Sequence, residues 1–203
     1  MVLTDKNPYR ESGVDTEGAG KLVDWLKDSS SIEGSSPKPT NAKNYGQTLG
    51  GLGGFAACFQ PNFSSFKEPV LVSCTDGIGT KLLLGIQTKK LKGLGQDLAG
   101  MCLNDLYTMG ATPLFFLDYF ATGTLDHHQF KDVVGGLKEV LDAVNCGLVG
   151  GETAELPGLY EKGHFDMAGF VVGVSEKQSL PNVENVKAGD ALIALPSLSL
   201  IHI

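Results

Sequence analysis

The stretch PVLVSCTDGIGTKL, residues 69–82, contains a strand, a turn and the start of a helix in direct succession. Residues 69–75 are mainly apolar or β-branched, which predicts a strand. Gly77 and Gly79 allow the backbone to turn. Residues 80–89 predict a short helix that begins directly after this turn.

The rest of the chain continues the alternation of helices and strands. The clearest element is a helix at 126–145, where apolar residues recur at i, i+3, i+4 and i+7. Residues 113–121 are apolar on both faces, which predicts a central strand covered on both sides. The other predicted elements are helices at 16–28 and 94–109 and strands at 54–59, 147–149, 165–176 and 191–203. This order indicates an α/β (α+β) fold.

The composition indicates a globular chain with a sizeable core. Of 203 residues, 42% are hydrophobic and 19% are charged, enough for one large domain or for one domain and part of another. The net charge of −7 argues against nucleic acid and anionic membranes as partners. The first residues lack the apolar core of a signal peptide, and no apolar run approaches the ~20 residues of a membrane span. The four cysteines form no CxxC pair, so we expect buried thiols in a cytoplasmic protein.

Asp76 follows the first strand, within a turn that is rich in glycine. Thr75 and Thr80 add hydroxyl groups, and Lys81 adds a positive charge. Mg²⁺ prefers one or two carboxylates together with phosphate oxygens, and the amides of a glycine turn suit anions. The stretch lacks the GxxxxGK[ST] pattern of a P-loop. A phosphate–magnesium site and a simple tight turn both remain open from these residues.

Asp105 falls within the apolar arc of the helix predicted at 94–109. At 100° per residue it lies on the same side as Cys102 and Leu106, and Asn104 lies at the edge of that arc. A carboxylate on a buried helix face is costly unless it is paired or binds a metal ion. We therefore expect either an ion pair or a metal ligand at this position.

Two further acidic positions and one glycine-rich stretch remain open to more than one interpretation. Glu152 and Glu155 follow a Gly-Gly turn, where they could cap a helix N-terminus or bind a metal ion. Asp118 interrupts the apolar strand, as a structural partner or as a site residue. The stretch TLGGLGGF (48–55) could be a nucleotide-contact loop or a tight turn.

Four sequence runs together resemble a known family of enzymes. These runs are DGIGTKLLLGI, GQDLAGMCLNDLYTMGATPLFFLDYFATG, GLVGGETAELPGLY and FDMAGFVVGV. In this order, they resemble the phosphoribosylformylglycinamidine cyclo-ligase (aminoimidazole ribonucleotide synthetase) family, over residues 9 to 195 or so. The resemblance implies the N-terminal domain of that family's fold, with a mixed sheet packed with helices and pairing across a homodimer.

The resemblance also implies an activity. The family uses ATP and Mg²⁺ to phosphorylate an amide oxygen of formylglycinamidine ribonucleotide. Ring closure then gives aminoimidazole ribonucleotide, ADP and phosphate. An alternative is another ATP-using member of the superfamily, such as a thiamine monophosphate kinase. A catalytically incomplete nucleotide-binding or dimerisation fragment is a further alternative.

The resemblance implies a division into three parts and a set of site residues. The parts are an N-terminal extension with a mobile loop (1–45), an ATP-binding domain (46–176) and the truncated start of a second domain (177–203), because LSLIHI replaces the family's continuation at 198–203. Asp76 and Lys81 are the expected catalytic residues, and Asp76, Asp105 and Glu152 the expected Mg²⁺ ligands. The residues expected to contact ATP or substrate are Gly51, Gly53, Gly54, Thr75, Gly77, Gly79, Thr80, Asp97, Asn104, Gly151, Glu152 and Thr153. No residue is assigned as the general base for ring closure.

Overall fold

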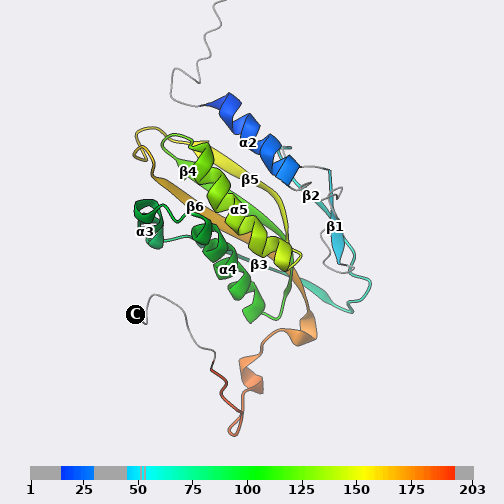
Figure 1. The fold of residues 1–203 in the computed structure, drawn as a ribbon. Helices are drawn as coiled ribbons and strands as arrows, with labels where there is room; N and C mark the ends of the chain where they lie inside the picture. The colour runs from blue at the N-terminus through cyan, green and yellow to red at the C-terminus, as the bar shows by residue number, and fades with distance from the viewer. Residues whose placement is uncertain (1–14, 30–44, 51, 53, 195–203) are drawn as a thin grey trace, which may run out of the picture.

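The fold is a four-stranded sheet with helices packed on one side and a separate two-stranded hairpin (Figure 1). The computed structural model describes residues 15–29, 45–50, 52 and 54–194. The helices are α2 (Thr16–Ser29), α3 (Lys81–Thr88), α4 (Lys92–Thr108) and α5 (His127–Ala143). The strands are β1 (Gly46–Leu49), β2 (Cys58–Pro61), β3 (Pro69–Gly77), β4 (Thr112–Thr122), β5 (Gly147–Glu155) and β6 (Phe165–Glu176), and two single 3-10 turns follow at Lys177–Ser179 and Val183–Asn185.

The main sheet is mixed, as the family resemblance implies, and its strand order is β3-β6-β4-β5. Strand β6 runs antiparallel to both β3 and β4, whereas β4 and β5 are parallel. A parallel pair needs a crossover connection, and α5 supplies it. This order places β3 and β5 at opposite edges of the sheet. The expected site residues near β3 are therefore separated from those on β5.

Helices α4 and α5 lie side by side across the same face of the sheet (Figure 1). The α5 helix begins with Asp126 as its N-cap, whose carboxylate accepts the backbone N–H groups of His128 and Gln129. The core between helices and sheet is mainly apolar. It contains Leu98, Cys102 and Leu106 from α4, Val133 and Leu137 from α5, and Phe116, Phe120, Met167 and Val171 from the sheet.

The backbones of α4 and α5 approach each other directly at two glycines. A Cβ atom on Gly95 would overlap the carbonyl oxygen of Val133, and one on Gly136 would overlap the carbonyl oxygen of Lys92. The absence of a side chain at these two glycines therefore allows the two helices to lie this close together. The contact is completed by the ammonium group of Lys92, which lies 2.9 Å from the Glu139 carboxylate.

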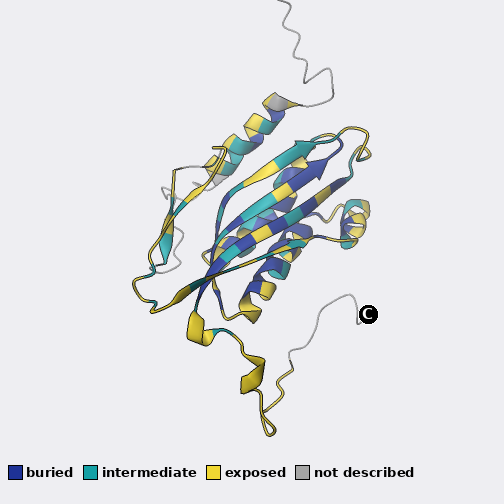
Figure 2. Ribbon diagram, turned by 180° about the vertical axis from the view of Figure 1, so that it is seen from behind, coloured by how far each residue is buried: buried dark blue, intermediate teal, exposed yellow. Residues whose placement is uncertain are grey.

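The other face of the sheet has no covering helix within the described part of the chain (Figure 2). Apolar side chains project from it, including Leu71, Tyr119 and Phe170, which are 62%, 42% and 38% exposed. Only one end is covered, where Phe59 of the hairpin packs against Phe115 with ring centroids 5.2 Å apart. The expectation that residues 113–121 are covered on both sides is therefore wrong for the described chain.

Several element boundaries differ from the predicted ones because strand pairing extends or moves them. The predicted strand at 54–59 lies instead at Cys58–Pro61, where it pairs with Gly46–Leu49. Strand β3 continues through Asp76 and Gly77, because both pair with β6. Strand β5 likewise runs through Gly150 to Glu155 beside β4, so no helix begins there. The helices and β6 lie within two residues of their predicted bounds.

The predictions for the two ends of the chain and for the cysteines have different outcomes. Residues 191–194 form no strand, and residues 195–203 lie outside the described part. Most of the predicted N-terminal extension and loop (1–45) also lies outside it. Cys102 and Cys146 are buried as expected, whereas Cys58 is exposed on the hairpin, so the expectation of four buried thiols is wrong at that position.

Candidate functional site

Asp76 lies at the end of β3, on the side of the sheet that faces the helices. Exposure alternates along β3, and Asp76 shares the less exposed side with Val72 and Cys74. Its Oδ1 atom accepts the backbone N–H of Gly77 at 2.8 Å. The chain then turns through Gly79, whose φ of +71° favours glycine, and enters α3. The predicted glycine turn therefore begins just after Asp76 rather than around it.

Asp105, on the neighbouring helix α4, is exposed and not buried. The α4 helix follows β3 at the edge of the sheet, so the side of α4 that carries Asn104 and Asp105 is open to solvent. The expectation of a buried carboxylate is wrong because helical periodicity does not show where the sheet ends. The Sγ atom of Cys74 donates to the carbonyl oxygen of Cys102 at 3.2 Å. Burial raises the pKa of the Cys74 thiol, and the negative charges of Asp105 and Asp76 raise it further.

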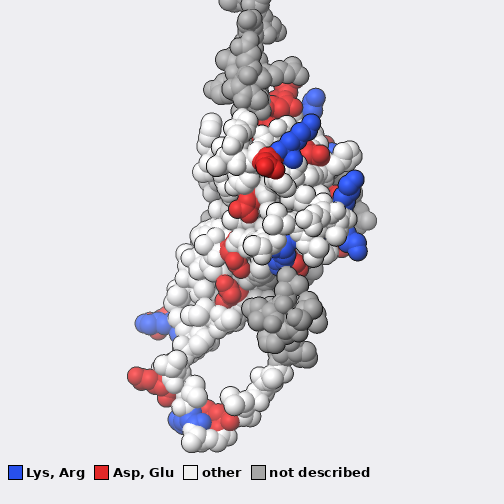
Figure 3. Space-filling model, turned by 90° about the vertical axis from the view of Figure 1, so that its left-hand side faces the viewer, with Lys and Arg blue, Asp and Glu red and all other residues white. Residues whose placement is uncertain are grey.

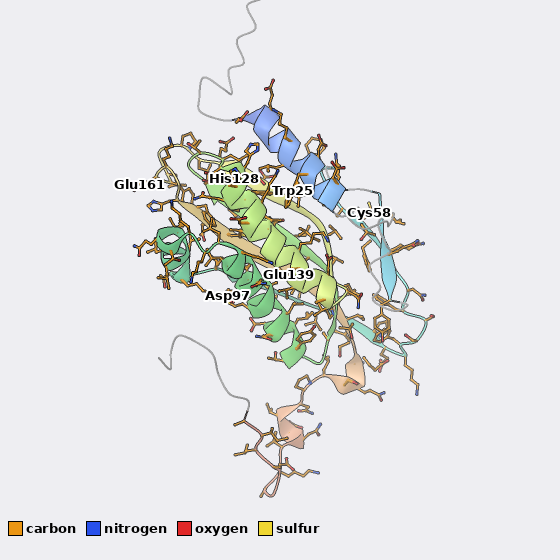
Figure 4. All side chains as sticks on the ribbon, in the orientation of Figure 1. Trp25, Cys58, Asp97, His128, Glu139 and Glu161 are labelled. Carbon is orange, nitrogen blue, oxygen red and sulfur yellow. The ribbon has the colours of Figure 1, made fainter. Side chains whose placement is uncertain are left out.

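Lys81 reaches the same flank of α4 from the first residue of α3. Its Nζ atom lies 3.1 Å from the Oδ2 atom of Asp97, which projects from α4 (Figure 4). The Lys81 side chain is 24% exposed and that of Asp97 is 53% exposed. Figure 3 shows no continuous basic patch on this side of the molecule, where acidic and basic side chains are both scattered over the surface. The Lys81 charge is therefore a local feature of the edge formed by β3, α3 and α4.

The threonines beside Asp76 differ in their surroundings. The Thr75 hydroxyl donates to the carbonyl oxygen of Gly169 at 2.8 Å, on the uncovered side of the sheet. Thr80 is exposed at the start of α3 and makes no side-chain cap. A Cβ atom on Gly77 would meet nothing within 4 Å, so this glycine borders open space. Of these residues, Thr80 and Gly77 are accessible to a ligand at the β3 edge.

Gly151, Glu152 and Thr153 lie on β5, at the edge of the sheet opposite β3. Three inter-strand spacings separate the two edges, roughly 14 Å. Glu152 is paired with Tyr119, and both belong to the uncovered face, whereas Asp76 belongs to the helix-covered face. A single chain therefore does not bring Glu152 beside Asp76 and Asp105.

Two other expectations concern the same elements. The helix-capping alternative for Glu152 and Glu155 is wrong, because both lie in a strand. The Glu155 carboxylate instead accepts the backbone N–H groups of Asp15 at 2.6 Å and Leu125 at 2.9 Å.

Within the described residues, no three His, Cys, Asp or Glu side chains are grouped closely enough to hold a metal ion by themselves. Gly54 is exposed between β1 and β2, and Gly51 and Gly53 lie outside the described residues.

Asp118 is the most unusual acidic residue on the helix-covered face. It lies on the central strand β4, and the strand register places it in one row with Asp76, Gly169 and Gly151. It is partly buried, and no ion pair of the described chain includes it. Burial raises the pKa of its carboxyl to about 7, and a hydrogen bond from its own backbone N–H opposes this shift. The structural ion pair left open by the sequence is therefore absent from the described residues.

Replacing Asp118 with asparagine should stabilise the fold at alkaline pH. Because the carboxyl has a higher pKa in the folded chain than its ordinary 3.8, its ionisation weakens the fold as the pH rises through about 7. We expect D118N to raise the free energy of unfolding by about 2 kcal/mol at pH 8, with the difference vanishing below about pH 4. Urea unfolding of both proteins from pH 4 to 8 measures this. A pH-independent difference would contradict it.

The fold and this edge define a class of protein: α/β domains in which helices cover one face of a mixed sheet, with acidic residues at the end of an edge strand. Within this class the chain belongs to the family described as AIR synthase related protein, N-terminal domain, whose sequence model matches residues 56–175. A curated protein from Picosynechococcus, named phosphoribosylformylglycinamidine cyclo-ligase, is 46% identical over 189 residues. That match covers 93% of this chain and 52% of the relative, so the chain spans about half the relative's length.

Solved structures share the fold at much lower identity. A thiamine-monophosphate kinase from Stenotrophomonas maltophilia superposes with a TM-score of 0.57 at 18% identity, over 78% of this chain and 43% of that one. The hydrogenase maturation protein HypE in complex with ATP gives a TM-score of 0.49 at 19% identity, over 59% of this chain and 35% of that one. The likeness to the kinase supports the fold alone. In the described residues, no helix is both long and apolar enough to span a bilayer.

Proposed function

We propose that this chain is the ATP-binding part of a cytoplasmic enzyme of purine biosynthesis that converts formylglycinamidine ribonucleotide into aminoimidazole ribonucleotide. The observation that carries the proposal is the 46% identity to a phosphoribosylformylglycinamidine cyclo-ligase along 93% of this chain. In the proposed reaction, ATP phosphorylates the amide oxygen of the substrate. A nitrogen–carbon bond then closes the ring as the carbon–oxygen bond breaks, and phosphate and ADP are released.

The edge formed by β3, α3 and α4 is the proposed site for the ATP phosphates. Asp76 and Asp105 would hold Mg²⁺, which needs only one or two protein carboxylates when phosphate oxygens complete its coordination. Bound Mg²⁺ would offset the phosphate charge during transfer. Lys81, released from Asp97, and the amides of the turn at Gly79 would bind phosphate oxygens.

The remaining expected site residues fall into two groups. Thr80, Asn104 and Asp97 border the proposed phosphate site, and Gly77 keeps its entrance open. Thr75 and Glu152 on the uncovered face of the sheet, and Gly151 and Thr153 on the helix-covered side of β5, are proposed contacts for substrate or nucleotide. The glycine-rich loop with Gly51, Gly53 and Gly54 is proposed to contribute nucleotide contacts.

A second copy of the chain is the proposed partner of the uncovered sheet face. Leu71, Tyr119 and Phe170 would otherwise leave an exposed apolar surface across three strands. Glu152 lies on this same face. Pairing of two such faces would carry Glu152 to the interface, where it could act in a site that one chain does not complete.

An ADP-release assay with purified chain tests the proposed reaction. With Mg²⁺ and ATP present, we expect ADP to form when formylglycinamidine ribonucleotide is added and not when thiamine monophosphate is added. ADP formation with thiamine monophosphate alone would contradict the proposal and favour a kinase.

A second candidate is a nucleotide-binding fragment that does not complete the reaction. It is favoured by the observation that the chain spans 52% of its relative's length. Calorimetry distinguishes the two: a fragment should bind Mg·ATP yet release no ADP with either substrate. Mg·ATP binding without turnover would thus retain the site and remove the catalytic part of the proposal.

A further inference from the structure

Asp118 is partly buried, and its two neighbours across the strands differ in exposure. Asp118 lies between Phe116 and Phe120 along β4, and both of these rings are buried in the core. On the β6 side, the space above Gly169 is filled by the Phe116 ring and the Cys102 sulfur, where a Cβ atom would overlap. On the β5 side, the neighbour is Gly151, which is exposed. Among the described residues, the β5 side is therefore the more open of the two strand neighbours of Asp118.

The absence of a side chain at Gly151 leaves space for the Asp118 carboxyl group. A Cβ atom at this position would overlap the Oδ1 atom of Asp118 and also its backbone oxygen. Any larger residue would fill this space. The sequence marked Gly151 as a contact for ATP or substrate, and the structure shows a physical reason for glycine there.

The Asp118 carboxyl group has no cationic partner among the described residues. An ionised carboxylate in partly apolar surroundings is costly unless a cation or several N–H donors neutralise it. No described Lys, Arg or His pairs with Asp118, and the only hydrogen bond to it that contributes to its pKa comes from its own backbone N–H. A cationic group from a bound molecule would supply what the described chain does not.

We propose that Asp118 binds the amidine group of the substrate. This inference rests on the proposed function, whose substrate carries an amidine. A protonated amidine is planar and cationic, and its two N–H groups can donate in parallel to the two oxygens of one carboxylate, as a guanidinium does. Asp118 thereby orients the nitrogen end of the substrate, entering from the Gly151 side, while the phosphate site lies at the opposite edge of the sheet.

A pair of matched ligands tests this assignment. Formylglycinamide ribonucleotide has an amide oxygen in place of the amidine nitrogen and therefore lacks the positive charge. By calorimetry, we expect the wild-type chain to bind formylglycinamidine ribonucleotide roughly 10- to 100-fold more tightly than this amide analogue. Asp118→Asn should lose most of that preference by weakening the amidine ligand alone.

A control variant separates this effect from a general change of charge. Asp166 lies on the neighbouring strand β6 and is exposed, and its Oδ1 atom accepts the backbone N–H of the following residue, Met167, at 2.8 Å. Asp166→Asn removes the same charge and should keep the wild-type preference. Unchanged Mg·ATP binding by Asp118→Asn would show that the variant is folded.

The two proposals fail in different ways. If Asp118→Asn retains the wild-type preference for the amidine ligand, the role of Asp118 is refuted and the proposed function stands. If the wild-type chain binds both ligands equally, Asp118 likewise has no amidine role. If the wild-type chain binds neither ligand, the proposed substrate is wrong for this chain, and the assignment of Asp118 fails with it.

Discussion

Gly95→Ala is expected to lower the free energy of unfolding by about 3 kcal/mol, and the midpoint of thermal unfolding by about 10 °C. The new Cβ atom would overlap the carbonyl oxygen of Val133 and approach the backbone nitrogen of Leu137. Backbone atoms of a packed helix cannot move aside as a flexible side chain can. The two helices must therefore separate, which loosens the core at Leu98 and Val133.

Gly100→Ala provides a matched control on the same helix. Gly100 also lies inside α4, but a Cβ atom there would meet nothing within 4 Å. Alanine favours the helix over glycine, so this change should stabilise the chain by about 0.5–1 kcal/mol. Thermal and urea unfolding of the two variants measures the contrast. Equal effects at both positions would mean that α4 and α5 are not in direct backbone contact.

Asp105→Asn is expected to weaken Mg·ATP binding about 100-fold. The proposed metal site has only two protein carboxylates, so the loss of one removes half of the charge that the protein offers to the cation. Calorimetric titration of the chain with ATP in excess Mg²⁺ measures the change. When a chelator replaces Mg²⁺ in the same titration, the variant should bind ATP no more weakly than the wild type does, because removal of a negative charge does not disfavour the binding of free ATP.

Asp132→Asn is the control for Asp105→Asn. Asp132 is exposed on α5, away from β3, so the variant has the same change in net charge at a different helix. We expect its Mg·ATP affinity to equal that of the wild type. An Asp105→Asn variant with unaltered affinity would remove Asp105 from the proposed metal site. Equal weakening by both variants would indicate only a long-range effect of charge.

The fold class could be predicted because its signals are local. The period of apolar residues in α5 and the alternation along β6 depend only on neighbours in sequence, and both elements lie close to their predicted bounds. The hairpin and the length of β5 could not be predicted in this way. Gly46 belongs to a strand because it pairs with Pro61, which is distant in the sequence. Glu155 belongs to a strand because it pairs with Thr122, and the chain between these two residues includes a helix.

The candidate site was predictable in part for the same reason. The residue types at Asp76, Lys81 and Asp105 indicate phosphate and metal chemistry, and the structure places these residues on β3, α3 and α4, where α4 packs against both β3 and α3. It does not bring Glu152 there, because the strand order β3-β6-β4-β5 places Glu152 at the other edge and on the other face. The apolar arc of α4 also placed Asp105 on a buried side, although the sheet ends there.

The sequence by itself determined the family and the alternating elements, and it indicated the acidic residues proposed to hold a cation on phosphates. Only the tertiary structure decided which of these residues meet. Register and strand order fix side chains across tens of residues, and no local pattern carries that information. The isolation of Asp118 between Gly151 and Gly169 is the clearest example, because it depends on three strands pairing in one row.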